Sequence, residues 1–158
     1  MTDYRVIIAG SRSFNDYELL REQCLSILQE KMRTHRVVIV SGHARGADSL
    51  GERFAKEFSL PFELHPAKWR LLGKAAGMVR NAEMAKCSDA LIAFWDGKSR
   101  GTAHMVNIAR RQMLDISVFN YNELVMKTCI FRTEENISKF EPNPDIDLYQ
   151  SKGICGHR

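Results

Sequence analysis

The chain has 158 residues, of which 44% are hydrophobic and 27% charged, and its formal net charge is +4 at pH 7. This length and composition fit one globular domain with a hydrophobic core and a tail. No apolar run approaches the roughly 18 residues of a membrane span. A strand-like segment starts after three residues, so we expect no signal peptide, no membrane association and a cytoplasmic protein.

The cysteines and histidines show no spacing typical of a metal site. The four cysteines contain no C-x-x-C pair, and His43 and His104 have no ligand pattern nearby. We therefore expect reduced thiols, no metal and no cofactor.

The first half of the chain alternates between strand and helix. Residues 5–9 are an apolar run that ends at Gly10, which is typical of a buried parallel strand. Asn15 and Glu18 predict a capping box at the start of an amphipathic helix. Residues 36–40 repeat the strand pattern, and apolar positions 50, 54 and 58 repeat the helical one.

The second half continues this alternation. Residues 61–65 predict a third strand, a longer loop follows, and residues 75–87 predict a helix. Residues 90–95 predict the fourth strand, apolar positions 106, 109 and 113 mark a helix, and residues 115–119 predict the fifth strand. The pattern indicates an α/β fold: a five-stranded parallel sheet in the order 3-2-1-4-5 with helices on both faces.

We place this α/β domain at residues 1–120 and a C-terminal extension at residues 121–158. Within the extension, residues 125–132 indicate an extra strand, and Pro142 and Pro144 exclude a helix. We expect the extension to cover a sheet edge, to support a dimer or to be partly disordered.

Four short segments combine small residues with an arginine: residues 10–12, 41–48, 80–84 and 99–102. Three of them join a strand to a helix, where backbone N–H groups and the helix dipole favour an anion. In the predicted strand order, the winding reverses between the first and fourth strands. The loop at Gly10 and the loop at residues 96–102 therefore flank one crevice at the carboxyl ends of the strands. We predict a phosphate-binding pocket there.

The residues predicted to bind the ligand are Gly10, Ser11, Arg12, Ser41, Gly42, Arg45, Gly46, Asp48, Arg80, Asn81, Trp95, Ser99, Gly101 and Thr102. Arginine suits phosphate because its planar donors match two oxygens. Alternatively, Ser41 or Asp48 is a helix cap with Arg45 as its ion-pair partner, and Gly101–Thr102 only starts a helix. Trp69 and Trp95 either stack on a nucleobase or belong to the core.

Four motifs occur in a fixed order over about residues 4–119: G-S-R, S-G-x-A-R-G-A-D, A-G-x-x-R-N-x-x-M and W-D-G-x-S-x-G-T. In these the chain resembles the YspA-like branch of the SLOG superfamily. That resemblance implies a Rossmann-like nucleotide-binding domain at residues 1–120. The superfamily includes the LOG phosphoribohydrolases, which cleave nucleoside monophosphates, and the DprA proteins, which bind single-stranded DNA. Other members sense nucleotide or ADP-ribose-type signals.

The chain departs from the hydrolases at Lys98 and Ser99, which replace two glycines, and at Met105. Their signature P-G-G-x-G-T-x-x-E falls on residues 97–105, where Gly101 and Thr102 remain but Met105 replaces the glutamate. A carboxylate stabilises the oxocarbenium-like state of N-glycosidic cleavage, which methionine does not do. If the chain is an enzyme, it is an N-glycosidic hydrolase or transferase, with catalytic candidates Arg80, Asp48, Glu83 and Asp96.

Three functions follow as hypotheses. The first is binding of a nucleotide, nucleotide sugar or ADP-ribose-type ligand for sensing or sequestration. The alternative is a nucleoside 5′-monophosphate phosphoribohydrolase or a related transferase, and the second alternative is DprA-like binding of single-stranded DNA. The last ranks lowest because the sequence lacks a long basic stripe. We expect a small-molecule partner and a homodimer.

Overall fold

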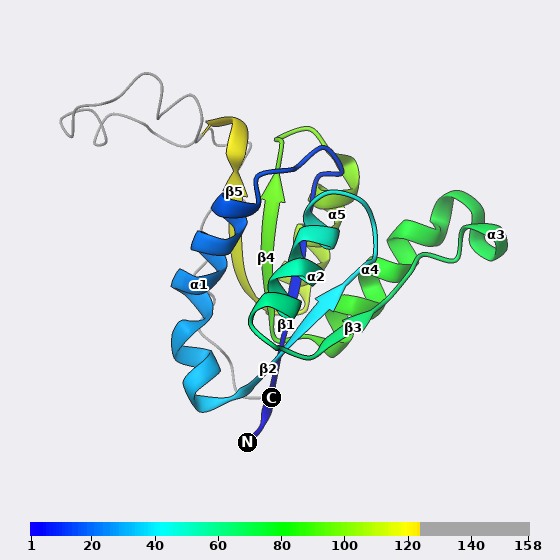
Figure 1. Cartoon of the computed structure of the whole chain (residues 1–158). Coiled ribbons are helices and arrows are strands. Elements are labelled where there is room, and N and C mark those ends of the chain that lie inside the picture. Colours follow the sequence, from blue (N-terminus) through cyan, green and yellow to red (C-terminus); the bar gives the residue numbers. More distant parts are fainter. Residues whose placement is uncertain (124–158) are drawn as a thin grey trace.

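A computed structural model describes residues 1–123, which form a five-stranded sheet covered by helices (Figure 1). All strands are parallel and follow the order β3-β2-β1-β4-β5. The strands are β1 (Asp3–Gly10), β2 (Arg36–Ser41), β3 (Phe62–Leu64), β4 (Ala90–Trp95) and β5 (Asp115–Asn120). The predicted fold class and strand order are confirmed.

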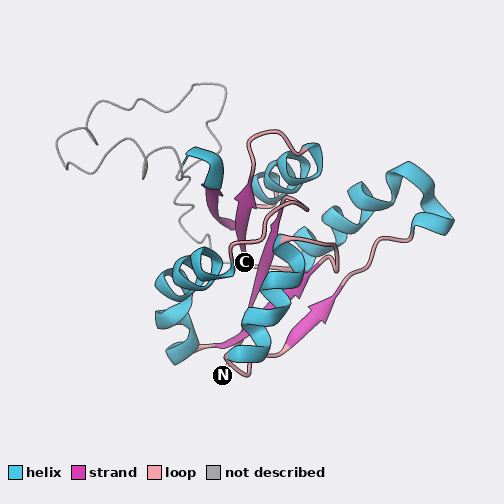
Figure 2. Cartoon of the chain, turned by 45° about the horizontal axis from the view of Figure 1, so that its top comes forward, coloured by secondary structure: helices cyan, strands magenta, loops and turns pink. Residues whose placement is uncertain are grey.

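Helices cover both faces of the sheet. Helices α1 (Tyr17–Thr34) and α2 (Ala47–Glu57) pack on one face, and α4 (Ala76–Cys87) and α5 (Arg100–Arg111) pack on the other. The predicted long loop before α4 contains a short helix, α3 (Trp69–Leu72), and a 3-10 turn (Gly73–Ala75). This segment and the start of α4 project beyond the edge of the sheet (Figures 1 and 2).

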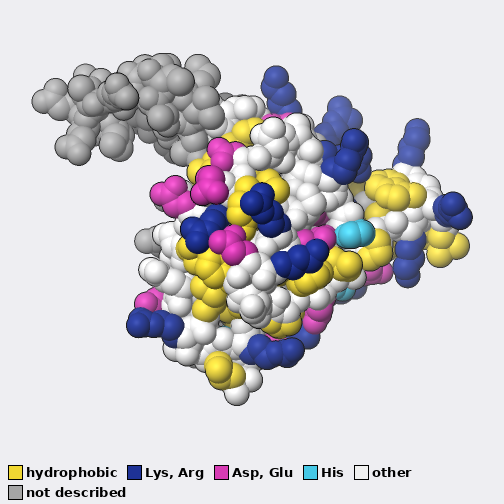
Figure 3. Space-filling view, in the orientation of Figure 1, with side chains coloured by type: hydrophobic (Ala, Val, Ile, Leu, Met, Phe, Trp, Pro, Cys, Tyr) yellow, Lys and Arg dark blue, Asp and Glu magenta, His cyan; other side chains and the backbone are white. Residues whose placement is uncertain are grey.

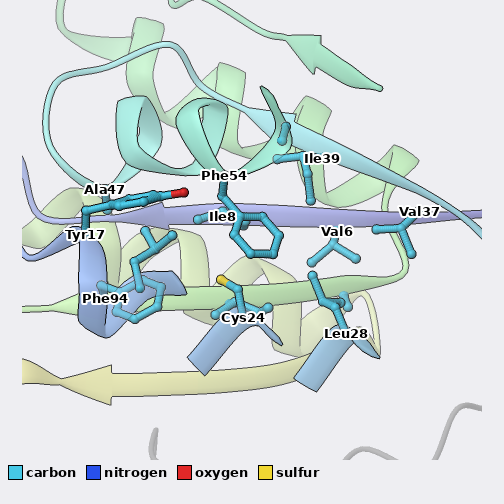
Figure 4. Close-up of a cluster of buried hydrophobic side chains, with 14 of the residues drawn as sticks. Val6, Ile8, Tyr17, Cys24, Leu28, Val37, Ile39, Ala47, Phe54 and Phe94 are labelled. Carbon is cyan, nitrogen blue, oxygen red and sulfur yellow. The ribbon is translucent and has the colours of Figure 1, made fainter. Parts of the chain in front are cut away.

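The two faces of β1 supply two separate cores. Val6 and Ile8 belong to the core under α1 and α2, whereas Ile7 and Ala9 belong to the core under α4 and α5. Figure 4 shows Val6 and Ile8 among the side chains of the first core. Burying each large apolar side chain stabilises the fold by about 1.5–3 kcal/mol. A continuous apolar run is therefore what a central strand requires.

The start of α1 differs from the prediction. Asp16, and not Asn15, is the N-cap, and its carboxylate Oδ1 accepts the backbone N–H of Leu19 at 3.0 Å. The predicted capping box of Asn15 and Glu18 is therefore wrong, because the helix begins one residue later than expected.

The end of α5 also differs. The predicted apolar face included Met113, but α5 ends at Arg111. Met113 has a φ of 61° and is 76% exposed, so it lies in the turn that leads into β5.

Some predictions concern residues that the structure does not describe. The expected strand at residues 125–132 lies outside the described residues, and the boundary at residue 120 stays a prediction. Within residues 1–123, none of the helices has the length and apolar character needed to span a bilayer.

Candidate functional site: a cationic cleft at the strand ends

A cleft of about 690 Å³ opens where β1 and β4 end. Its walls come from the loop after β1, the first turn of α2, the α3–α4 segment and the loop that leads into α5. The predicted site residues that line it are Gly10, Ser11, Arg12, Asp48, Arg80, Asn81, Asp96, Ser99, Gly101 and Thr102. The reversal of winding between β1 and β4 places these loops together, as expected.

A second depression of about 530 Å³, which we call the side hollow, adjoins the cleft. It is lined by Gly42, His43, Ala44, Arg45, Pro66, Ala67 and by Arg12, Trp69 and Arg80. Ala44, Arg12, Trp69 and Arg80 line both depressions. The segment after β2 thus faces mainly the side hollow.

Four predicted site residues line neither depression: Ser41, Gly46, Glu83 and Trp95. Ser41 is buried, and its hydroxyl donates to Glu52 Oε1 at 2.8 Å and accepts the N–H of His43 at 3.0 Å. Glu83 lies exposed on α4. Trp95 belongs to the core, as in the alternative interpretation, and its indole N–H donates to Ser99 O at 3.0 Å.

The loops after β1 and β4 are joined through Ser11. The N–H of Ser11 donates to Phe94 O at 2.9 Å, and its Oγ accepts the N–H of Asp96 at 3.0 Å. Gly46 holds the first turn of α2 against this loop, because its φ is 79° and a Cβ there would meet Ser11 O at 2.3 Å. These contacts fix the backbone that surrounds the cleft.

Asp96 closes the loop that leads into α5. Its Oδ1 accepts the N–H groups of Lys98 at 2.9 Å and Ser99 at 2.7 Å. Partial burial acts to raise the pKa of Asp96, but these bonds and the Ser11 hydroxyl outweigh it, so the pKa lies below its ordinary value. Asp96 is therefore an ionised carboxylate at the cleft wall.

Arg80 reaches the cleft from α4. Its Nη1 donates to Gly42 O at 2.5 Å and its Nε donates to Asn81 Oδ1 at 3.0 Å. Asn81 in turn donates from Nδ2 to Gly101 O at 3.3 Å and lies 3.2 Å from His104 Nδ1. This network connects α4 to the first turn of α5 and holds the guanidinium in place.

Burial, Asp48 and Arg12 each affect the pKa of Arg80. Burial lowers the pKa of Arg80, Asp48 acts to raise it, and the positive charge of Arg12 lowers it further, leaving the pKa below its ordinary value. The half-buried guanidinium is therefore in an environment that an added anion would improve.

Asp48 is a buried carboxyl in the first turn of α2. Its Oδ2 accepts the N–H of Ala44 at 3.4 Å. Burial raises the pKa of Asp48 to about 6, although Arg80 acts to lower it. Near neutral pH this group therefore exchanges a proton easily, a property useful to an acid or a base.

Gly42 is the residue that allows Arg80 and Asp48 to approach the backbone. A Cβ at this position would lie 2.4 Å from Arg80 Nη1 and 2.7 Å from Asp48 Oδ2. A side chain here would therefore displace the guanidinium or the carboxyl.

Several lining residues were not among the predicted site residues. They are Ala9, Ser13, Ala44, Trp69, Lys74, Gly77, Met78, Met84, Arg100, His104 and Met105. Lys74 and Arg100 could have been predicted from the sequence, because both are cations in segments beside the predicted crevice. The guanidinium carbon of Arg12 lies 6.0 Å from the centre of the Trp69 ring. Met105 is 1% exposed and lies at the cleft, so the position of the hydrolase glutamate carries no acid.

Within residues 1–123, one group of side chains has metal-ligand types close together. Donor atoms of Glu63, His65 and Cys87 lie within 4.8 Å of one another. None of the three lines the cleft. Glu63 Oε1 already accepts from Arg5 Nη2 at 2.9 Å, so a cation there would compete with that guanidinium.

Comparison with known proteins identifies a family and related folds. The model of the YspA, cpYpsA-related SLOG family matches residues 4–71. Over 125 residues the chain is 36% identical to the Gene 61 protein of Mycobacterium phage D29, covering 75% of this chain and 97% of the phage protein.

Two solved structures share the fold. DNA processing protein A from Helicobacter pylori, studied for its single-stranded DNA binding mode, matches with a TM-score of 0.50 and 20% identity over 80% of this chain and 74% of that one. DprA from Streptococcus pneumoniae matches with a TM-score of 0.56 and 16% identity over 90% of this chain and 63% of that one. At these identities the likeness concerns the fold alone. The family model and the phage relative show that the chain belongs to the YspA, cpYpsA-related SLOG family.

Proposed function

We propose that the chain binds a nucleotide, nucleotide sugar or ADP-ribose-type ligand in the cleft, and that it senses or sequesters this ligand. The observation that carries the proposal is Arg80, a half-buried guanidinium held by Gly42 O and Asn81 at the cleft. Arg12, Lys74 and Arg100 also line the cleft, so among the described lining residues four cations outnumber the two carboxyl groups, Asp48 and Asp96. A phosphate would relieve this excess of positive charge.

The first turn of α5 supports the same ligand chemistry. Ser99 is the N-cap, Gly101 and Thr102 line the cleft, and the Thr102 hydroxyl donates to Ser99 Oγ at 3.2 Å. The first N–H groups of a helix have no partner within the helix, and the helix dipole favours an anion beside them. Phosphate at this turn would lie on the same cleft as Arg80.

Thermal unfolding with a panel of AMP, ADP, UDP-glucose and ADP-ribose tests the proposal. A ligand at one hundred times its dissociation constant stabilises the folded state by about 2.7 kcal/mol, and chromatography should recover it unchanged. Arg80→Gln should abolish the shift in melting temperature. Lys86→Gln is the matched control, because Lys86 is an exposed cation on the same helix that does not line the cleft.

Two results would contradict the proposal. One is a panel in which no compound shifts the melting temperature. The other is a shift that Arg80→Gln and Lys86→Gln reduce equally. Single-stranded DNA belongs in the same panel. Strong binding of an oligonucleotide that weakens steeply with salt would favour the DNA-binding alternative.

Cleavage of the N-glycosidic bond is a second candidate function, supported by the two carboxyl groups that line the cleft. Burial raises the pKa of Asp48 to about 6. The pKa of Asp96 lies below its ordinary value, because backbone N–H groups outweigh the effect of partial burial. Two carboxyls with pKa values moved apart are typical of an acid and an ionised stabiliser in one site. Arg80 would hold the phosphate of the substrate, and Glu83 lies outside the cleft.

Release of free base from nucleoside monophosphates, followed by chromatography, tests this activity. Asp48→Asn and Asp96→Asn should each lower turnover at least tenfold if these groups act as acid and stabiliser. Retention of full turnover in both variants would exclude them as catalytic residues. If no base is released at high protein concentration, the cleavage activity is wrong and ligand binding remains as the proposed function.

We also propose that the chain forms a homodimer. Light scattering measures the mass in solution, and the single chain has a mass of 18.1 kDa. A mass of two chains supports the dimer, and a mass of one chain overturns it.

A further inference from the structure

The cleft and the side hollow meet at four shared residues, Arg12, Ala44, Trp69 and Arg80. The cleft of about 690 Å³ is already within the range of a small-molecule site. The side hollow adds a further 530 Å³. A single nucleotide in the cleft would leave the side hollow without an occupant.

The shared boundary carries two guanidiniums. Arg80 is fixed by its bonds to Gly42 O and Asn81 Oδ1, whereas Arg12 is exposed at the loop after β1. The two are close enough for their charges to repel. Two adjacent guanidinium forks match the oxygens of two linked phosphates. A diphosphate is therefore the anion that fits this boundary.

The side hollow is itself cationic. Arg45 lines it and is exposed, and none of the described residues that line it is acidic. Gly42 and Pro66 form part of its wall, so backbone and small side chains leave room for a sugar or a ring. The group that it accepts is therefore polar or negatively charged.

Trp69 lies on the projecting α3 segment, where Figure 3 shows Lys, Arg and hydrophobic side chains gathered together. It is 50% exposed and lines both depressions. The guanidinium carbon of Arg12 is 6.0 Å from its ring centre, at the outer limit of a cation–π interaction, so the ring lies beside the shared cations. Stacking of a base on an aromatic ring contributes about 1–3 kcal/mol.

We propose that the site is built for a bipartite ligand, in which a diphosphate joins a nucleoside to a second polar group. The diphosphate binds Arg12 and Arg80, one half occupies the cleft, and the other half occupies the side hollow beside Arg45. A ring of the ligand stacks on Trp69. This inference rests on the proposed function. It predicts that the site binds dinucleotide-like molecules and nucleotide sugars more tightly than mononucleotides.

Calorimetric titration with two matched pairs of probes tests the inference: ADP-ribose against AMP, and UDP-glucose against UMP. At least one diphosphate-bridged probe should bind ten or more times as tightly as its mononucleotide. Arg45→Glu should reduce the affinity for that probe at least three times more than the affinity for its mononucleotide, because Arg45 lines only the side hollow. Arg33→Glu is the control, since it makes the same charge change at an exposed residue of α1 that lines neither depression.

The outcomes separate this inference from the function on which it rests. If each mononucleotide binds as tightly as its bridged partner, or if Arg45→Glu weakens both probes equally, the bipartite site is wrong while nucleotide binding stands. If no probe binds the wild-type protein, the proposed function itself is wrong. If Arg33→Glu weakens binding of the diphosphate-bridged probe as much as Arg45→Glu does, the effect comes from the overall charge of the protein. That result would overturn the inference.

Discussion

Two opposing effects act on the pKa of Asp48. Burial disfavours its charged form, whereas the neighbouring Arg80 favours it, and burial prevails so that its pKa rises to about 6. The folded protein therefore holds this proton more tightly than the unfolded chain does, where the ordinary value is 3.8. The stability that Asp48 contributes is fully present below about pH 4 and is lost as the pH rises through about 6.

Asp48→Asn should remove this loss of stability on ionisation. Relative to wild type, the free energy of unfolding of the variant should rise by about 2 kcal/mol between pH 4 and pH 7. Urea unfolding at a series of pH values measures the difference. Asp96→Asn should show the opposite slope in the acidic range, because the pKa of Asp96 is lowered. Parallel profiles for Asp48→Asn and wild type would contradict the burial argument.

Helix α1 shows how one residue decides an element's beginning. Asn15 and Asp16 are both good N-cap residues. In the structure the Asp16 carboxylate accepts the N–H of Leu19, and the negative charge also lies beside the positive end of the helix dipole. The cap is therefore assigned to Asp16.

Asp16→Ala should lower the free energy of unfolding by about 1 kcal/mol, the usual effect of losing a capping side chain. Asn15→Ala should change it by less than about 0.5 kcal/mol, because exposed residues without such a role contribute little. Urea denaturation of both variants measures the two effects. A larger loss in Asn15→Ala than in Asp16→Ala would restore the capping box that the sequence predicts.

The elements differ in how far the sequence predicts them. Ala90–Trp95 is predicted to the residue, because six buried apolar residues lie between turn residues. Helix α3 is missed, because four residues are too short for a helical period to show. The loops at Gly10 and Gly101 are predicted to share the cleft, since strand order determines which loops meet.

Other parts of the site depend on packing that a sequence does not reveal. The bond from Arg80 to Gly42 O joins residues 38 positions apart. The exposure of Trp69 and the burial of Trp95 follow from where α3 and β4 lie, whereas the sequence favours Trp95 as the ligand-binding residue. The strand-end loops are therefore predictable, whereas the side chains that reach them from other elements are not.

Residues 1–123 are organised around one sheet, and each of its faces carries one of the two cores. β1 contributes Val6 and Ile8 to the core under α1 and α2, and Ile7 to the core on the other face. Loss of β1 would therefore disrupt both cores, so we expect the described part of the chain to unfold as a single cooperative unit. Opening of the cleft and opening of α1 should then occur together, in the global unfolding of this unit.

Cys24 reports on this cooperativity from α1, which does not line the cleft. It is fully buried, and burial raises the pKa of the Cys24 thiol, so the native thiol should resist modification. In a variant with Cys87, Cys129 and Cys155 changed to Ser, labelling of Cys24 by a thiol reagent should require global unfolding. Its rate should be at least about a thousand times below that of the unfolded chain.

A ligand of the cleft should slow the labelling of Cys24 although it does not touch α1. When unfolding is cooperative, a probe that binds only the folded state reduces the unfolded population by a factor of 1 + [L]/Kd, which is about a hundredfold at one hundred times Kd. The measurement is the rate of labelling with and without a probe that shifts the melting temperature. Arg80→Gln should abolish the protection. Labelling that stays unchanged when the probe saturates the protein would mean that α1 opens independently of the cleft.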